Sequence, residues 1–338
     1  MKNSLPIGKL NPDLLESLFT SYRISDPAVI IGPKVGEDAA VIDMGDSLLV
    51  AKTDPITFAT DEIGWYLVCV NGNDIATMGA QPRWLLVTLL LPEDKATEAL
   101  VKDIFSQIIG ACEEFDITLC GGHTEITYGL DRPIAIGQML GKVDKDRLIT
   151  SSGAQVGDDI ILTKGIAIEA TSIIARERGD MLLSRGYSPQ YIARARQYLK
   201  DPGISVLKEA MIATQVGGIH AMHDPTEGGL VTGLHEIARC SQVGVTAWPE
   251  EIYIFPECRE LCSEFDIDPT GAIASGALLI IADPARSGEI TEVLAQSGIS
   301  CFVIGQIVEK EKGLFFQEGA ERRPIPIFET DEIAKIFQ

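Results

Sequence analysis

The spacing of hydrophobic and polar residues predicts alternating strands and helices in the first half of the chain. Two apolar runs, 39–42 and 47–51, flank the turn Met44-Gly45-Asp46 and predict a β-hairpin. Further apolar runs predict strands over 84–91, 117–120 and 133–143, whereas apolar residues at helical spacing predict helices over 61–79 and 94–115. This order of elements indicates a mixed α/β domain.

Charged and small residues at 144–158 interrupt the pattern and predict a domain boundary. A second α/β unit follows. Its predicted strands are 160–163, 219–222, 276–282 and 301–307, and its predicted helices are 168–178, 188–199, 203–215, 226–240, 256–265 and 286–297. The sequence thus divides into an N-terminal segment (1–35), a first domain (36–150), a second domain (151–325) and a tail (326–338).

The charge balance restricts the classes of partner. The 338 residues carry 28 Lys and Arg against 49 Asp and Glu, a formal net charge of −21, and no basic stripe is present to neutralise a nucleic-acid backbone. No apolar run approaches the ~20 residues of a membrane span, and we find no targeting pattern. We therefore expect a cytoplasmic protein that binds neither nucleic acid nor membrane.

The seven cysteines lie mostly in apolar runs, such as Leu67-Val68-Cys69-Val70. An odd number in a chain of this size indicates buried, reduced thiols rather than a disulfide framework. Cys258 and Cys262 are four residues apart on a predicted helix, and without a second such pair they indicate buried thiols more than a zinc site.

Carboxylates recur at strand ends and inside one helix. Glu37 and Asp38 precede the first hairpin strand, Asp54 ends the second before Pro55, and Asp74 follows poor helix formers in an apolar helix. Alone, each has a structural reading: an acidic turn, a turn starter, or a helix that ends and restarts. Together these four acids predict ligands for a divalent ion such as Mg²⁺, which would hold the phosphates of a nucleotide.

A glycine pair follows the predicted strand 117–120. Gly121 and Gly122 would let backbone N–H groups approach a phosphate closely. The next residue, His123, is either a polar loop residue or a general base. The predicted nucleotide contacts are Lys52, Thr53, Asn73, Gly121, Gly122, Thr124 and Glu125.

The segment Asp224-Pro225-Thr226-Glu227-Gly228-Gly229 precedes a predicted helix. The N–H groups at a helix start favour an anion. Alternatively, Asp224 or Thr226 is an ordinary helix cap. We predict that Asp224, together with His123, acts in catalysis, with Asp224 facing the acceptor. The Walker A pattern is absent, which excludes a P-loop enzyme.

Six motifs, in this order, resemble the aminoimidazole ribonucleotide (AIR) synthetase-related superfamily from about residue 30 to about 310. They are Gly36–Ala40, Thr53-Asp54, Asn73–Pro82, Gly121–Thr124, Asp224–Leu230 and Ser275–Leu279. The branch most similar is that of hydrogenase maturation proteins that dehydrate a carbamoyl group, through Val70-Asn71-Gly72, His235–Ala238 and Asp266–Pro269. The resemblance implies an N-terminal mixed-sheet domain that dimerises into a central β-barrel, a C-terminal α/β domain, and Mg-ATP bound near the dimer interface.

Two features depart from that branch. Its chains end in a cysteine that carries the carbamoyl group, whereas this sequence ends Ile336-Phe337-Gln338, and its usual Gly-Asp-Thr-Lys is Gly122-His123-Thr124-Glu125 here. We therefore expect a homodimeric, Mg-ATP-dependent enzyme that activates or phosphorylates an oxygen of a small or protein-borne acceptor. The alternative is an accessory protein that binds nucleotide without turnover and acts through a maturation partner.

Overall fold

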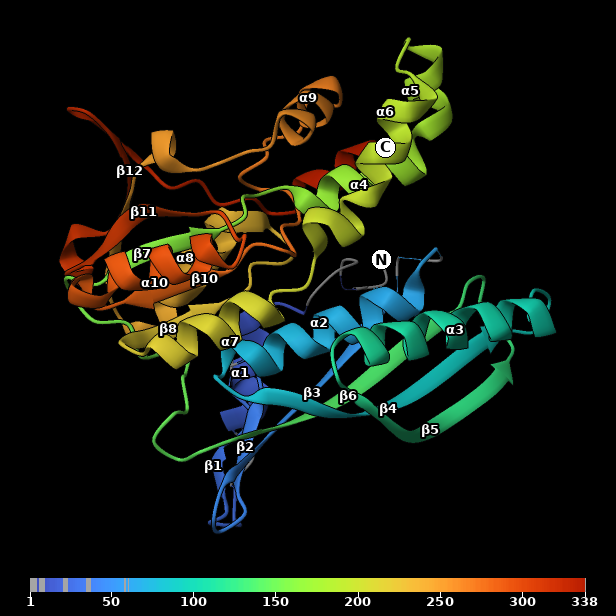
Figure 1. Ribbon diagram of the computed structural model, residues 1–338, viewed down its shortest axis with the longest axis horizontal. Coiled ribbons are helices and arrows are strands. Elements are labelled where there is room, and N and C mark those ends of the chain that lie inside the picture. Colours follow the sequence, from blue (N-terminus) through green and yellow to red (C-terminus); the bar gives the residue numbers. More distant parts are fainter. Residues whose placement is uncertain are drawn as a thin grey trace.

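The computed structural model describes residues 5, 10–20, 24–34, 38–57, 59 and 61–337. These residues form two β-sheets with helices packed between and around them (Figure 1). The predicted α/β architecture with two sheet-containing domains is confirmed, whereas the limits 36–150 and 151–325 stay a prediction. Among the described residues, no helix combines the length and the apolar character needed to cross a bilayer.

The first sheet has six strands within the described residues, in the order β1-β2-β3-β6-β4-β5. Neighbouring strands are antiparallel except β4 and β5, which run parallel. Helices α2 (Ile63–Thr77) and α3 (Glu98–Glu114) cover one face (Figure 1). The strands are β1 (Val29–Ile31), β2 (Ala40–Asp43), β3 (Leu48–Ile56), β4 (Gln81–Pro92), β5 (Thr118–Thr127) and β6 (Ile134–Val143).

The two faces of this sheet differ in burial. Along β4, Leu85 and Leu89 are fully buried beneath the helices, because side chains of a strand alternate between faces. The side chains that point to the opposite face are more exposed, and several of them are apolar. Trp84 is 36% exposed there, and Leu86 and Ile136 are half-buried. Exposed apolar side chains grouped on a sheet face are typical of an interaction surface.

The second sheet has seven strands among the described residues, in the order β13-β12-β9-β11-β7-β10-β8, and only β12 and β9 pair in parallel. Helices α7 (Leu207–Val216) and α10 (Pro284–Gln296) pack on one face and α8 (Gly229–Ser241) on the other. The strands are β7 (Asp159–Thr163), β8 (Ile219–His223), β9 (Gly244–Ala247), β10 (Leu279–Ala282), β11 (Cys301–Val308), β12 (Leu314–Glu318) and β13 (Glu321–Pro324).

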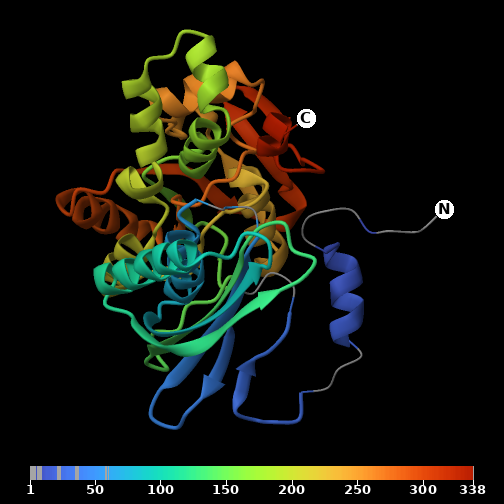
Figure 2. The ribbon, with the colours of Figure 1, turned by 90° about the vertical axis from the view of Figure 1, so that its right-hand side faces the viewer.

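Four further helices form a lobe that projects beyond the second sheet in Figure 1. They are α4 (Ile168–Glu177), α5 (Gly179–Ser184), α6 (Pro189–Gln197) and α9 (Pro256–Glu264). Helix α1 (Pro12–Thr20) lies beside the sheets (Figure 2), where Arg239 of α8 pairs with Asp13 and Glu16. Short helical turns occur at Leu199–Gly203, Pro249–Glu251, Lys310–Lys312 and Glu332–Phe337.

Several predicted elements need correction. Strand β5 continues to Thr127 rather than ending at Cys120, because its backbone pairs with β4 as far as Pro92. Strands β9, β12 and β13 were not predicted, since each is short, and β13 has no buried residue to create an alternating pattern. Helix α8 begins at Gly229 and α7 at Leu207, both three or four residues later than predicted.

The residues Asn71, Asn73 and Asp74 do not break their helix. Helix α2 runs without interruption, and all three side chains are buried. The reading of a helix that ends and restarts is therefore wrong. Hydrogen bonds from these side chains to other parts of the fold compensate for their low helix propensity.

Asn73 ties the two halves of the molecule together. Its Nδ2 donates to Ile204 O at 2.9 Å, and Val206 N donates to its Oδ1 at 2.8 Å. From the other side, the buried Lys164 Nζ donates to Gly203 O at 3.2 Å and to Ser205 O at 2.6 Å. The segment 203–206 is thus held between the first sheet's main helix and the second sheet.

Replacing Asn73 by Ala should destabilise the protein. The variant leaves a buried carbonyl at Ile204 and a buried N–H at Val206 without partners, so we expect the free energy of unfolding to fall by about 1–3 kcal/mol. Chemical denaturation measures this loss. The control is Gln190→Ala on the exposed surface of α6, with a change within about 0.5 kcal/mol. Equal changes in the two variants would contradict the proposed role of Asn73 in holding the segment 203–206.

A buried carboxylate lies at the start of α4. Burial raises the pKa of Glu169 from 4.5 to about 8, and hydrogen bonds from Ser275 offset only part of this. The charges of Glu227 and Asp331 add to the increase. The folded protein therefore binds this proton more tightly than the unfolded chain does. The stability contributed by Glu169 is complete below about pH 4.5 and is lost as the pH rises through about 8.

The variant Glu169→Gln has no carboxyl group to titrate at this position, so it should not lose stability in this way as the pH rises. At pH 8.5 we expect it to be more stable than the wild type by an amount on the order of a few kcal/mol, and the difference should shrink towards pH 5. Denaturation curves at both pH values measure it. Glu177→Gln, an exposed position in the same helix, is the control and should show no such trend. A wild-type-to-variant difference that does not change with pH would refute the assignment.

Candidate functional site

Five acidic or basic residues predicted from separate motifs converge between the two sheets. Asp38 precedes β2, Lys52 and Asp54 share one face of β3, Asp74 lies in α2, and Asp224 follows β8. The charges of all four carboxylates act on Lys52. This convergence is the geometry that the metal hypothesis requires, and the ligand roles themselves stay a prediction.

Lys52 is the central positive charge of this cluster. Its Nζ lies 3.4 Å from Asp54 Oδ2 and 3.3 Å from Asp74 Oδ2. Burial alone would lower the pKa of Lys52, but the carboxylates of Asp74 and Asp54 outweigh it and raise the pKa above its ordinary value. Burial raises the pKa of Asp74 well above its usual range, and the attraction of Lys52 offsets only part of this increase.

A histidine links Asp38 to the second sheet. His223, the last residue of β8, has Nδ1 at 3.5 Å from Asp38 Oδ2 and Nε2 at 2.8 Å from Glu236 Oε2 of α8. Ser151 Oγ donates to the same Asp38 oxygen at 3.1 Å. Burial would raise the pKa of Asp38, yet the nearby imidazole and Lys52 lower it overall. For His223, burial is outweighed by the two carboxylates, and its pKa is raised well above the usual range.

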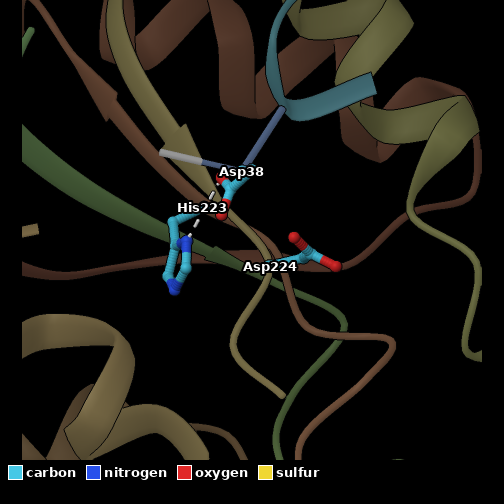
Figure 3. A group of neighbouring side chains, drawn as sticks. All are labelled: Asp38, His223 and Asp224. Carbon is cyan, nitrogen blue, oxygen red and sulfur yellow. Dashed lines mark hydrogen bonds and ion pairs between the residues drawn. The ribbon is translucent and has the colours of Figure 1, made fainter. Parts of the chain in front are cut away.

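Asp224 completes the group shown in Figure 3. The residue is 3% exposed, and its Oδ2 is buried without a hydrogen-bond partner. Burial and the charge of Asp38 raise the pKa of Asp224 to about 7. One potential ligand atom from each of Asp38, His223 and Asp224 lies within 4.8 Å of the others. The same small volume therefore holds two carboxylates and an imidazole.

Asn71 fixes the strand that carries Lys52 and Asp54. Asp54 N donates to Asn71 Oδ1 at 2.9 Å, and Asn71 Nδ2 donates to Asp54 O at 3.2 Å. The amide lies against Gly137 of β6, where a Cβ atom would come within 2.5 Å of Asn71 Nδ2. A glycine at 137 is thus required for α2 to approach the sheet closely enough to bring Asp74 beside Lys52.

The remaining residues of the first motifs lie elsewhere. Glu37 is outside the described residues. Thr53 lies on the opposite face of β3 from Lys52, and its Oγ1 donates to Gly137 O at 2.8 Å. The amide of Asn73 is engaged by Ile204 and Val206. The role of Glu37 as a metal ligand, and the roles of Thr53 and Asn73 as nucleotide contacts, stay predictions.

The glycine pair lies in a strand rather than a loop. Gly121 and Gly122 belong to β5, and a Cβ on Gly122 would meet Val87 O at 1.8 Å. Close pairing with β4 therefore explains this glycine without a phosphate. His123 and Glu125 are exposed on the same strand, with His123 Nε2 3.3 Å from Glu125 Oε2. Together with Thr124 they lie at the far edge of the first sheet, and the described contacts do not bring them to the Lys52 cluster.

The start of α8 is capped from the C-terminal tail. Asp331 Oδ2 accepts from Gly228 N at 2.6 Å, and its Oδ1 accepts from Ile273 N at 3.1 Å. Neither Asp224 nor Thr226 caps the helix, whose N-cap residue is Gly228 in the left-handed conformation, φ 81°. The ordinary-cap reading of Asp224 is therefore wrong, which leaves its carboxylate available to the cluster.

Sequence reasoning missed His223, Glu236 and Ser151. The signal for His223 was present, because it directly precedes Asp224 at the end of a predicted strand. Glu236 stood only within the resembling segment His235–Ala238, and Ser151 gave no signal, since only the fold brings this helix face and this turn to His223 and Asp38.

Comparison with known proteins agrees with this arrangement. Residues 36–143 match the N-terminal domain of the AIR synthase related protein family, and residues 155–316 match its C-terminal domain. A protein of Methanocaldococcus jannaschii named for hydrogenase expression and formation is 27% identical, with 97% of each chain covered. The selenide, water dikinase of Photorhabdus laumondii is 28% identical, covering 90% of this chain and 92% of that one.

Among solved structures, the hydrogenase maturation protein HypE in complex with ATP superposes with a TM-score of 0.73 at 22% identity, covering 91% of this chain and 92% of that one. At this identity the likeness establishes the fold alone. The two family matches together span most of the sequence. The chain therefore belongs to the AIR synthase related family, as its motifs predicted.

Proposed function

We propose that this protein is a Mg-ATP-dependent enzyme that phosphorylates, or activates by phosphorylation, an oxygen atom of a small or protein-borne acceptor. The observation that carries the proposal is the convergence of Asp38, Asp54 and Asp74 around Lys52, from three separate elements. Folding alone does not require buried acids to gather, because their mutual repulsion and desolvation oppose it.

The donor set fits a hard divalent cation. Mg²⁺ prefers carboxylate oxygens together with phosphate oxygens of the substrate, and the unpartnered Asp224 Oδ2 shows that this cluster is short of positive charge. Asp38, Asp54 and Asp74 would hold the ion. When bound, Mg²⁺ would neutralise phosphate charge in an in-line transfer.

The protein's own residues would position the reactants. Lys52 remains paired with Asp54 and Asp74 and would present its ammonium group to the phosphates. Asp224, which directly follows β8 and lies beside Asp38, would face the acceptor. The relatives support this chemistry: one is named a selenide, water dikinase, and the HypE structure contains ATP.

A homodimer would explain two features of the first sheet. Strand β5 is a ten-residue edge strand that is exposed along almost its whole length, and such an edge is normally covered or blunted. The adjoining sheet face exposes apolar side chains such as Trp84, which is 36% exposed. A second copy pairing here would also give His123, Thr124 and Glu125 a route to a nucleotide site that they do not reach within one chain.

Nucleotide binding tests the proposed function. Asp74→Asn keeps the shape of the side chain and removes its charge, so Mg-ATP affinity measured by calorimetry should fall by about 10- to 100-fold, because a contact to a charged group is worth about 1.5–3 kcal/mol. Asp46→Asn, in the exposed β2–β3 turn, is the control and should bind as the wild type does. Unchanged binding in Asp74→Asn contradicts the proposal. Binding without phosphate release over a panel of acceptors would favour the accessory-protein alternative.

Light scattering tests the homodimer. The wild type should have twice the chain mass of 36.5 kDa. Ile126→Asp places a charge on β5, where the side chain is 59% exposed, and should shift the protein to the monomer. Ile109→Asp, on the outer surface of α3 and 45% exposed, should leave the mass unchanged. A monomeric wild type would exclude the proposed interface.

A further inference from the structure

We propose that Asp331, in the C-terminal tail, is a positioning residue for the acceptor side of the site. It fixes the loop 224–228, which joins β8 to α8 and carries Asp224. The inference rests on the proposed function, because that function places Asp224 next to the acceptor. Its central measurement is made without nucleotide, so it can fail independently of Mg-ATP binding.

The position of the Asp224 carboxylate depends on the backbone that carries it. Its Oδ2 is buried without a hydrogen-bond partner, so this oxygen is not tied to a neighbouring group. The preceding residue, His223, ends β8 and pairs there with Leu279 of β10. One end of the loop is therefore fixed by the sheet. The other end, where the chain enters α8 at Gly229, has no strand to hold it.

Two glycines form this second end of the loop. Gly228 and Gly229 are in the left-handed conformation, with φ 81° and 67°, which glycine adopts readily but at a large cost in conformational entropy on folding. A Cβ on Gly229 would lie 2.6 Å from both Thr270 O and Ala272 O. The loop is thus able to lie closely against the segment 270–274, and it needs contacts from outside itself to remain there.

Asp331 supplies such contacts from a distant part of the chain. Its Oδ2 accepts from Gly228 N at 2.6 Å, and its Oδ1 accepts from Ile273 N at 3.1 Å. Oδ1 also accepts from Ile333 N at 2.8 Å, which holds the carboxylate itself in place. One charged group therefore joins the loop, the segment 270–274 and the tail. Hydrogen bonds to an ionised acceptor are about twice as strong as those between neutral groups.

The tail is also anchored independently of this carboxylate. Glu332 Oε2 accepts from Asp268 N at 2.9 Å. Further along, Ile336 is 2% exposed, and its carbonyl oxygen accepts a hydrogen bond from the guanidinium group of Arg178. Removing the Asp331 carboxylate should therefore release the loop while the rest of the tail stays in place.

The loop affects only one side of the site. Asp224 lies beside Asp38, with one carboxylate oxygen of each within 4.8 Å of the other. Lys52, Asp54 and Asp74 belong instead to β3 and α2. A displaced Asp224 would misplace the acceptor, and a misplacement of about 1 Å can cost about 100-fold in rate. The phosphates would still meet Lys52, so a released loop should lower turnover and leave the affinity for Mg-ATP unchanged.

Hydrogen exchange of the backbone amides, measured on the whole chain without nucleotide, tests the role of Asp331. The amides of Gly228 and Ile273 should exchange about 10- to 100-fold faster in Asp331→Ala, because each loses a hydrogen bond to a charged group. Asp331→Asn keeps one acceptor oxygen and should give intermediate rates. Asp283→Ala is the matched control, since Asp283 caps α10 by accepting from Ala285 N at 2.9 Å. It should leave both amides at the wild-type rate.

Phosphate release from Mg-ATP, with water as the acceptor, separates positioning from general stability. Asp331→Ala should lower kcat by about tenfold or more while the Mg-ATP dissociation constant stays within about threefold of the wild type, and Asp331→Asn should restore part of the rate. Asp283→Ala should change neither quantity, although it also loses a helix cap. Thermal unfolding of each variant checks that it folds.

Equal exchange at Gly228 in Asp331→Ala and the wild type would overturn the inference, as would faster exchange without a fall in kcat. A fall in kcat shared by Asp283→Ala would also overturn it, because the loss would then reflect stability rather than the loop. A wild type that binds no Mg-ATP, or releases no phosphate with any acceptor tested, would contradict the proposed function instead. The exchange rates would still decide whether Asp331 fixes the loop.

Discussion

The repulsion among buried carboxylates is the constraint on which the structure of the central cluster depends. Four aspartates come together where the two sheets meet. The basic side chains of Lys52 and His223 supply positive charge that opposes their mutual repulsion. Lys52 lies between Asp54 and Asp74, while His223 reaches Asp38 from the other sheet. Each cation therefore forms its ion pairs with different acids, although the charge of Lys52 also acts on Asp38 and Asp224. Charged as well as apolar side chains hold the two sheets together, since His223 belongs to the second sheet and Asp38 precedes the first-sheet strand β2.

Helix α2 shows how the fold supports that charge. Its consecutive polar residues cost helix propensity, yet each one makes a different tertiary contact. Asn71 holds the backbone of Asp54, Asn73 holds the segment 204–206, and Asp74 faces Lys52. The helix is thus a fixed element against which both sheets are positioned, and a shift of one turn would break all three contacts together.

Much of the fold and of the acidic cluster was predictable from the sequence, because the patterns that identify them involve residues close together along the chain. Apolar spacing identified the helices over most of their length, and the acids of Asp38, Asp54 and Asp74 stood out against apolar surroundings. The sequence alone left other features ambiguous. The Gly121-Gly122 pair suits a phosphate loop and a closely paired strand equally well, and only the approach of Val87 O distinguishes them. The segment His235–Ala238 indicated a family but not the role of Glu236, because that role depends on an imidazole thirteen residues earlier.

The two positive groups of the cluster are not equivalent, and this difference shapes what the site can do. A lysine ammonium is held on a long chain and has no lone pair to offer while charged, so Lys52 remains a counter-ion to Asp54 and Asp74. The imidazole of His223 lies between two carboxylates, Glu236 at Nε2 and Asp38 at Nδ1, which raise its pKa and make it a cation fixed at both nitrogens. The β3 and α2 side of the cluster therefore offers an ammonium group suited to phosphate oxygens, whereas the β8 side offers the buried carboxylate of Asp224, whose Oδ2 has no hydrogen-bond partner. A nucleotide whose phosphates meet the ammonium group of Lys52 would therefore lie at the join between the sheets, within reach of residues from both of them.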